Sequence, residues 1–151
     1  MNALGIRCSN SDFSYAIISG TNKLPEIIAI GQVNFPKGFS KAHSVRWFYQ
    51  EIETLITNYM IKRISIKASE AITAQKSLED RIEHEAMIFL AAANHNIREV
   101  SKKRKNTIAK DLGVKGKASY LAKLDTTPIP DFDKYNDKLK DAILTAWSEL
   151  P

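Results

Sequence analysis

The sequence predicts an α/β protein with a mixed, five-stranded sheet, helices on both faces and a C-terminal helix. Three observations favour this class: a β-rich opening, a βαβ pattern in the middle, and helix-periodic segments between and after the strands. With 151 residues, the chain is long enough to bury one sizeable core and too short for two. We therefore expect a single domain over residues 1–151.

The opening of the chain is typical of a three-stranded meander. Apolar and β-branched residues fill residues 3–8, 13–19 and 26–35, and the turn-forming sequences SNSD and GTNKLP separate them. Apolar residues then recur at spacings of three and four, which predicts an amphipathic helix from Ser44 to about Met60.

The middle of the chain predicts a βαβ crossover. Alternation indicates a strand over 61–69, helical spacing indicates a helix from about Ser77 to Asn94, and a short strand follows over 97–101. We expect this helix to bury one apolar stripe. Its members are Leu78, Ile82, Ala86, Phe89, Leu90 and Ala93. Because parallel strands end beside a crevice where ligands usually bind, Glu70 lies at a candidate functional position.

The last part of the chain predicts shorter helices and one longer one. Segments 107–113 and 119–124 have helical spacing, the stretch TTPIPDFD is linker-like, and a last helix runs from about Lys134 to Glu149. We expect this helix to direct its apolar residues toward the core. They are Leu139, Ala142, Ile143, Ala146, Trp147 and Leu150.

Composition excludes several classes of protein. With 44% hydrophobic and 26% charged residues, the chain is neither disordered nor of low complexity. No apolar run reaches the roughly 18 residues that cross a bilayer, and the sequence MNALGIRCSNSD lacks the regions of a signal peptide. We therefore expect a cytoplasmic protein. Its single cysteine, Cys8, has no disulfide partner and is expected to pack as a small core residue.

Positive charge is concentrated in one part of the chain. The formal net charge is +7 over residues 61–124, against +1 over 1–60 and −3 over 125–151. A local basic excess is expected where phosphates are neutralised, and Gly113 and Gly116 would let the backbone approach a phosphate closely. The candidate nucleic-acid-binding residues are Lys102, Lys103, Arg104, Lys105, Lys110, Lys115 and Lys117. A solvated surface loop is the alternative interpretation.

The order of these elements resembles the RNase H-like fold, and the chain resembles the RuvC-type Holliday junction resolvases over nearly its whole length. The first hairpin of that family, G-I-D-P-G-x-x-x-T-G-Y-G-V-I, runs in step with residues 5–18 without a gap. Glu70 falls at the family's strand-end glutamate. Residues 113–121, GVKGKASYL, resemble its DNA-facing G-x-G-x-A-x-K region, and Asp141 with Ala142 resembles its final D-A-L-A.

This resemblance implies binding of nucleic acid, DNA rather than RNA, and a possible homodimer, because these resolvases act on two-fold junctions. It also implies an endodeoxyribonuclease site that uses Mg²⁺ or Mn²⁺. The sequence departs from the family at three positions that matter for that site. Arg7 replaces the first metal-binding aspartate, Lys138 stands where the second helical acid would fall, with Asp137 one residue away, and Tyr120 replaces a lysine.

These departures predict a degenerate site. Hard divalent ions need clustered oxygen ligands, and the remaining carboxylates are those of Glu70, Asp137 and Asp141. A fixed positive charge about 4 Å from a divalent ion opposes it by roughly 8 kcal/mol at an effective dielectric constant near 20. We therefore expect Arg7 to replace the metal ion and to neutralise Glu70 and Asp141 through charge-assisted hydrogen bonds.

Two other hypotheses stay open. In the first, Arg7 points away and the chain is an active, metal-dependent, structure-selective endonuclease in which Asp12 or a histidine supplies the missing ligand. Asp12 is otherwise a turn former, and His84, between two glutamates on a helix, is typical of a solvated residue. In the second, the RNase H-like scaffold is a protein-interaction module whose former site only stabilises the fold.

Overall fold

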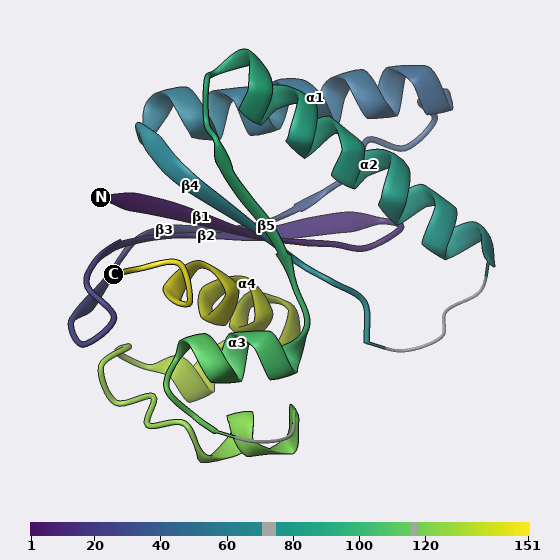
Figure 1. Cartoon of the computed structure of the whole chain (residues 1–151). Helices are drawn as coiled ribbons and strands as arrows, with labels where there is room; N and C mark the ends of the chain where they lie inside the picture. The colour runs from purple at the N-terminus through teal and green to yellow at the C-terminus, as the bar shows by residue number, and fades with distance from the viewer. Residues whose placement is uncertain (71–74, 116–117) are drawn as a thin grey trace.

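The computed structural model describes residues 1–70, 75–115 and 118–151, with the backbone alone described for 75–77 and 118–120. It confirms the predicted α/β class with one mixed, five-stranded sheet. The strands are β1 (Asn2–Cys8), β2 (Asp12–Gly20), β3 (Pro25–Asn34), β4 (Ile61–Lys67) and β5 (Glu99–Lys103). Their spatial order is β3-β2-β1-β4-β5 (Figure 1).

Strand pairing brings several charged residues to one edge of the sheet. Strands β1, β2 and β3 pair antiparallel as a meander, whereas β1 pairs parallel to β4, and β4 pairs parallel to β5. The carboxyl ends of the three parallel strands therefore point the same way. Arg7 lies near the end of β1, and Lys67 and Lys103 are register partners at the ends of β4 and β5.

Helices cover both faces of the sheet, as predicted. Helices α1 (Lys41–Asn58) and α2 (Gln75–Asn94) lie on one face, and α3 (Lys105–Asp111) and α4 (Asp137–Trp147) lie on the other (Figure 1). Two 3₁₀ turns, Ala118–Lys123 and Phe132–Lys134, connect α3 to α4. None of the helices in the described ranges combines the length and apolar character needed to cross a bilayer.

Local capping explains where the observed boundaries differ from the predicted ones. Helix α4 begins later than predicted because the Asn136 side chain accepts a hydrogen bond from the Leu139 N–H, which fixes Asn136 as the N-cap. Strand β5 also begins later, since the Ile97 N–H still bonds to the Ala92 carbonyl of α2. The stretch predicted as a linker packs against the core, because Ile129 is buried.

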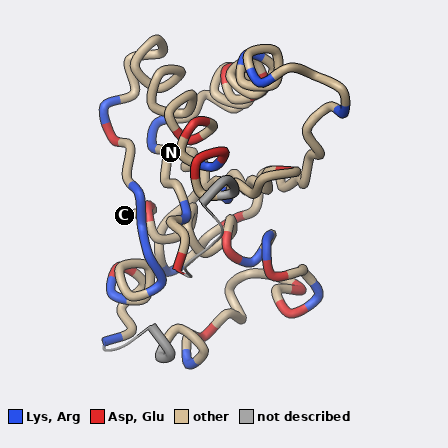
Figure 2. The backbone as a smooth tube through the Cα atoms, turned by 90° about the vertical axis from the view of Figure 1, so that its right-hand side faces the viewer, with Lys and Arg blue, Asp and Glu red and all other residues tan. Residues whose placement is uncertain are grey.

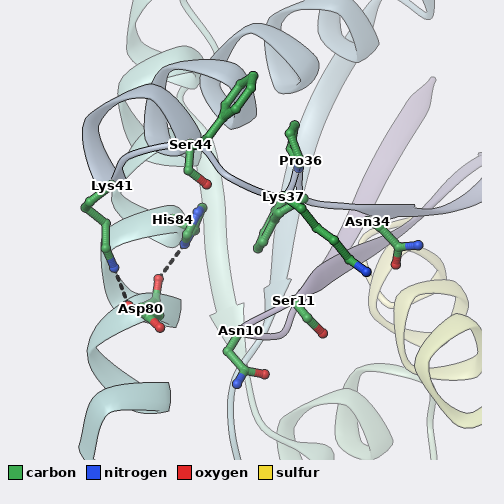
Figure 3. Close-up of a pocket in the computed structure, with 11 residues that line it drawn as sticks. Asn10, Ser11, Asn34, Pro36, Lys37, Lys41, Ser44, Asp80 and His84 are labelled. Carbon is green, nitrogen blue, oxygen red and sulfur yellow. Dashed lines mark hydrogen bonds and ion pairs between the residues drawn. The ribbon is translucent and has the colours of Figure 1, made fainter.

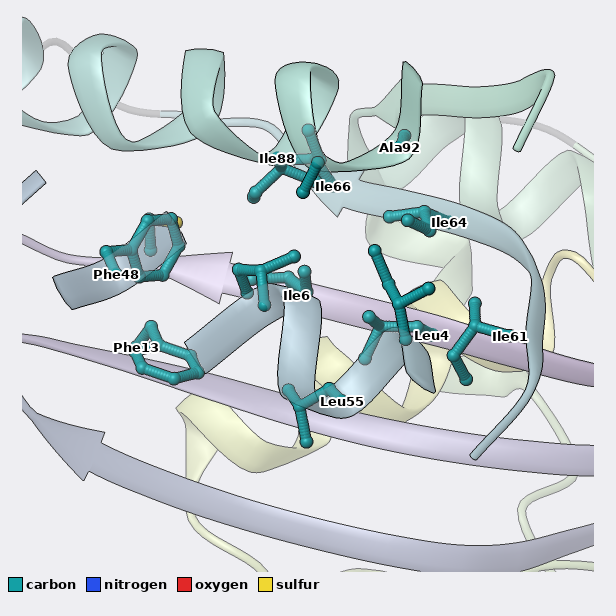
Figure 4. Close-up of a cluster of buried hydrophobic side chains, with 14 of the residues drawn as sticks. Leu4, Ile6, Phe13, Phe48, Leu55, Ile61, Ile64, Ile66, Ile88 and Ala92 are labelled. Carbon is teal, nitrogen blue, oxygen red and sulfur yellow. The ribbon is translucent and has the colours of Figure 1, made fainter. Parts of the chain in front are cut away.

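Large apolar side chains fill the space between the sheet and helices α1 and α2. Leu4 and Ile6 of β1, Ile64 and Ile66 of β4 and Phe48 of α1 are all fully buried there (Figure 4). Cys8 is also fully buried, which confirms its predicted role as a small core residue, and burial raises the pKa of its thiol. This cluster accounts for much of the hydrophobic stabilisation of the fold.

Helix α2 buries a different face from the predicted one. Ile88, Ala91 and Ala92 point inward and are buried, and His84 and Glu85 lie beside them. The predicted stripe instead lies on the outer surface, with Leu78, Ile82, Ala86, Phe89, Leu90 and Ala93 exposed. The helix has apolar residues on two faces, so spacing alone could not identify the inner one. On the inner face, the small side chains of Ala91 and Ala92 allow close packing.

Candidate functional site

Gly5 allows helix α4 to lie directly on strand β1. A Cβ atom at this position would lie 2.2 Å from the Ala142 carbonyl oxygen and 2.5 Å from the Ala146 nitrogen, both backbone atoms of α4. Since side chains two residues apart share a face of a strand, Arg7 points toward the same helix. The first turns of α4 are thereby held against the end of β1, which brings Asp141 to Arg7.

Arg7 and Asp141 form an ion pair. The Nε atom of Arg7 lies 3.2 Å from Oδ2 of Asp141, and about a quarter of each side chain is exposed. We expected Arg7 to neutralise both Asp141 and Glu70. The structure shows an ion pair of Arg7 with Asp141, whereas Glu70 pairs with Lys67. Arg7 therefore points toward the Asp141 carboxylate, and it stands at the position where the family motif has an aspartate.

Glu70 is held by two other groups. Nζ of Lys67 lies 3.1 Å from Oε1 of Glu70, and the backbone N–H of Lys105 donates to the same oxygen. Although burial alone would raise the pKa of Glu70, the hydrogen bonds from Lys105 and Lys67 lower it overall. Burial lowers the pKa of Lys67, whose side chain is only 4% exposed, and the Glu70 carboxylate opposes that shift.

Sequence reasoning missed the role of Lys67. The available signal was the alternation in β4, which places Arg63, Ser65 and Lys67 on one face of the strand. A lysine on that face, three residues before Glu70, lies at the same strand end as the carboxylate.

These residues line a cavity of about 190 Å³, which we name the basic cavity. Its charged lining residues are Arg7, Lys67, Glu70, Arg81, Lys105 and Asp141. The third predicted carboxylate, Asp137, lies elsewhere: it is exposed and lines an adjoining cavity of about 540 Å³ together with Lys140. The structure therefore brings Glu70 and Asp141 together around the basic cavity and leaves Asp137 outside it.

The residues of the basic cavity do not fit a divalent metal ion. Such an ion needs several oxygen ligands, and each of the two carboxylates here is already paired with a cationic side chain. Within the described ranges, no group of three or more histidine, cysteine, aspartate or glutamate side chains could hold a metal ion. Fixed positive charges of the protein thus lie beside the two carboxylates.

Asp12, considered above as a substitute ligand, is occupied at another place. Lys138 donates to both of its carboxylate oxygens, at 2.9 and 3.0 Å, and Gln32 donates to one of them at 2.8 Å. Burial alone would raise the pKa of Asp12, but the hydrogen bonds from Gln32 and Lys138 lower it overall. Lys138, which aligns with a family acid, thus forms a structural ion pair and faces Asp12.

The predicted basic segment divides into buried and exposed cations. Lys103 is buried and lies 2.7 Å from Glu149 and 2.8 Å from Asp111, and Lys102 pairs with Glu85. Arg104, Lys105, Lys110 and Lys115 are exposed, whereas Lys117 lies outside the described residues. The four consecutive basic residues 102–105 form the longest blue stretch in Figure 2. Exposed cations thus continue from β5 into α3, beside the basic cavity.

Another cavity, of about 620 Å³, lies beside the turn between β1 and β2 and is also lined from α1, α2 and the segment after β3 (Figure 3). His84 lines it and is 3% exposed, so our expectation of a solvated histidine is wrong. Its ring stacks on Phe35 at 4.4 Å between centroids, and its Nδ1 lies 2.6 Å from the Asp80 carbonyl oxygen. No sequence pattern predicts this stacking, because it depends on the path of the chain after β3. None of the candidate carboxylates lines this cavity.

No protein-family model matches the sequence, and no curated protein matches it. Solved structures do match. Thermus thermophilus RuvC in complex with a Holliday junction substrate superimposes with a TM-score of 0.75 and 11% identity, over 98% of this chain and 91% of that one. The yeast mitochondrial Holliday junction resolvase superimposes with a TM-score of 0.66 and 15% identity, over 97% of this chain and 76% of that one.

A viral protein has the same architecture. The fowlpox virus resolvase, solved with Holliday junction DNA, gives a TM-score of 0.52 and 13% identity, over 98% of this chain and 95% of that one. At identities this low, the superpositions establish a shared fold and no more. The chain therefore has the RNase H-like fold of RuvC and other Holliday junction resolvases, as its sequence indicated.

Proposed function

We propose that this chain is a RuvC-like protein that binds duplex or branched DNA, and that its capacity for metal-dependent cleavage is lost or impaired. One observation carries the second part: the two carboxylates of the basic cavity are paired with Arg7 and Lys67. Replacing a metal ligand by a cation removes an oxygen donor and adds repulsion toward a divalent ion. Binding of DNA then depends on the protein's own positive charges.

The exposed cations support the binding role. Helix α3 contains Lys105 and Lys110, Arg104 directly precedes it, and Lys115 follows it. Lys105 also lines the basic cavity. Contacts between such side chains and phosphates position a duplex without reading its sequence. The solved RuvC and fowlpox resolvase structures of the same fold contain Holliday junction DNA, which favours a branched or duplex partner.

Fluorescence anisotropy with a labelled four-way junction and a matched linear duplex, over a series of salt concentrations, tests this proposal. We expect affinity to fall steeply with salt, because binding releases counterions from the DNA. The double variant Lys110→Ala and Lys115→Ala should bind more weakly, with a slope of log affinity against log salt reduced by about two. Lys62→Ala, exposed at the other end of β4, is the matched control.

Three results would contradict the proposal. Binding by the double variant with an unchanged salt slope would exclude the α3 cations as phosphate contacts. Metal-dependent cleavage by the wild type that is lost in Asp141→Asn would establish the alternative, an active structure-selective endonuclease. If the wild type bound no DNA, the protein-interaction module would be the remaining hypothesis.

We also propose a two-fold homodimer formed through the outer face of α2. This face carries four large apolar side chains, those of Leu78, Ile82, Phe89 and Leu90, at 36–52% exposure. A two-fold axis near Ala86 would bring Leu78 opposite Ala93 and Ile82 opposite Phe89 and Leu90, so that these apolar side chains would be buried against one another. In this antiparallel arrangement the acidic first half of α2 meets residues 86–94, which carry no charge.

Sedimentation velocity tests the dimer. The wild type should sediment as two 17.0 kDa chains, and Leu90→Glu should sediment as one because a charge would be buried at the contact. Leu24→Glu, in the exposed β2–β3 turn, should leave the dimer intact. A monomeric wild type at micromolar concentration would refute this arrangement.

A further inference from the structure

The basic cavity has more positive than negative lining groups. Arg7, Lys67, Arg81 and Lys105 stand against the carboxylates of Glu70 and Asp141. Each carboxylate has its own cation, Asp141 with Arg7 and Glu70 with Lys67. Among the described residues, no carboxylate forms an ion pair with Arg81 or with the side chain of Lys105. Two positive charges are therefore left to face the cavity.

Arg81 also has an unused hydrogen-bond donor. Its Nε atom is buried and has no hydrogen-bond partner among the described residues. Its Nη2 makes one long contact, 3.5 Å, to the Lys67 carbonyl oxygen. A buried guanidinium N–H without an acceptor is unfavourable, and buried polar groups in folded proteins nearly always find a partner. Since no described residue accepts from this N–H, its partner must be another hydrogen-bond acceptor, and the two surplus charges favour an anion.

We infer that the basic cavity binds a phosphate group, with Arg81 and Lys105 as its main contacts. This inference rests on the proposed function, because the phosphate would belong to the backbone of the bound DNA strand. Phosphate oxygens accept several hydrogen bonds and suit the planar fork of an arginine. In this arrangement the anion occupies the place that a metal ion would need, and the site binds phosphate directly through side chains.

The positions of the two residues suit this role. Arg81 comes from α2 on one side of the sheet edge, and Lys105 opens α3 on the other, so an anion between them would bridge two elements. The Lys105 side chain is exposed, which gives access from solvent. The paired carboxylates of Glu70 and Asp141 limit the excess to two positive charges.

Isothermal titration and thermal melting with two probes test the inference. The probes are inorganic phosphate and a twelve-residue oligothymidylate, which separate free phosphate from a strand phosphate as the source. Both should raise the melting temperature of the wild type in low-salt buffer. We expect phosphate to bind at least tenfold more weakly to Lys105→Ala and to Arg81→Gln. The matched controls are Lys62→Ala and Arg98→Gln, at an exposed lysine and an exposed arginine outside the cavity.

The outcomes are distinct. Equal phosphate binding by the wild type and both cavity variants, or no binding of either probe by the wild type, would overturn the inference. Lys105→Ala keeps the test decisive if Arg81→Gln fails to fold, because the Lys105 side chain is exposed. Binding of phosphate without oligothymidylate would support the anion site but assign it to free phosphate. Junction binding by the wild type, measured separately, decides the proposed function, so either idea can fail alone.

Discussion

The two faces of the sheet differ in how they pack and in what they carry. Toward α1 and α2, β1 directs large residues such as Leu4 and Ile6 into a continuous apolar cluster. Toward α4, the same strand presents Ala3, Gly5 and then Arg7, and α4 contacts it through alanines and Asp141. Both faces bury apolar residues, and the α1–α2 face has the larger cluster, while the other face brings a helix close enough to place charged groups at the sheet edge.

Removing a large side chain from the α1–α2 face should have the largest effect on stability. Phe13 is fully buried, and the centroid of its ring lies 5.0 Å from the ring centroid of Phe48 and 6.1 Å from that of Trp47. We expect Phe13→Ala to lower the free energy of unfolding by about 4 kcal/mol, measured by urea denaturation. Phe39→Ala, at a half-exposed ring, should change it by less than about 1 kcal/mol. Equal losses would contradict the difference between buried and exposed rings.

Filling the close approach on the α4 face should come next. Gly5→Ala would place a methyl group against two backbone atoms of α4, and we expect a loss of about 3 kcal/mol in the free energy of unfolding. Gly38→Ala is the control. It has a φ of +79° but no atom within 4 Å of an added Cβ, so backbone strain alone should cost about 1 kcal/mol. A tolerated Gly5→Ala would mean that α4 is free to move away from β1.

The buried Asp12 ion pair predicts a pH dependence. The pKa of Asp12 is lower in the folded protein than its ordinary value of 3.8, so its stabilisation is fully present above that value and is lost as the pH falls through the folded pKa. Asp12→Asn should lose about 2 kcal/mol at pH 7 and less at pH 3, as measured by urea denaturation at each pH. Asp133→Asn, at an exposed carboxylate, should match the wild type at both pH values. A pH-independent loss would refute the ion-pair account.

The smallest effect is expected at the sheet edge. Arg7→Ala removes the partner of Asp141, but because a quarter of each side chain is exposed to solvent, the loss should be only about 1 kcal/mol. Thermal melting at low and high salt measures it, and the difference should shrink in high salt as screening weakens the pair. A loss as large as that of Phe13→Ala would instead indicate that the cluster is part of the core.

Most of the fold could be predicted from the sequence because strands, turns and helix caps leave local patterns. The meander before Asn34 and the βαβ order after Ile61 are examples. The inner face of α2 could not be predicted, since the helix has apolar residues on two faces and only the sheet decides between them. Helix ends shifted where a side chain such as Asn136 supplied the cap.

The candidate site was predictable only in part. The resemblance to the RuvC-type resolvases placed Arg7, in the hairpin, and Glu70, at a strand end, near one another, and the pairing of Arg7 with Asp141 followed from opposite charge. Alternation in β4 was a local signal for the position of Lys67, whereas the role of Arg81 depends on how α2 lies across the sheet, which no local pattern encodes. Lys103 shows the converse, because a residue in a basic run proved to be buried among carboxylates.

The most direct test of the central claim is to incubate a labelled four-way junction with the wild type in Mg²⁺, in Mn²⁺ and in EDTA, and to measure affinity and products together. If side-chain cations have replaced the metal ion, the three affinities should agree within about twofold at equal ionic strength, and the junction should stay intact. Junction cleavage in Mg²⁺ or Mn²⁺ that EDTA abolishes would contradict the account.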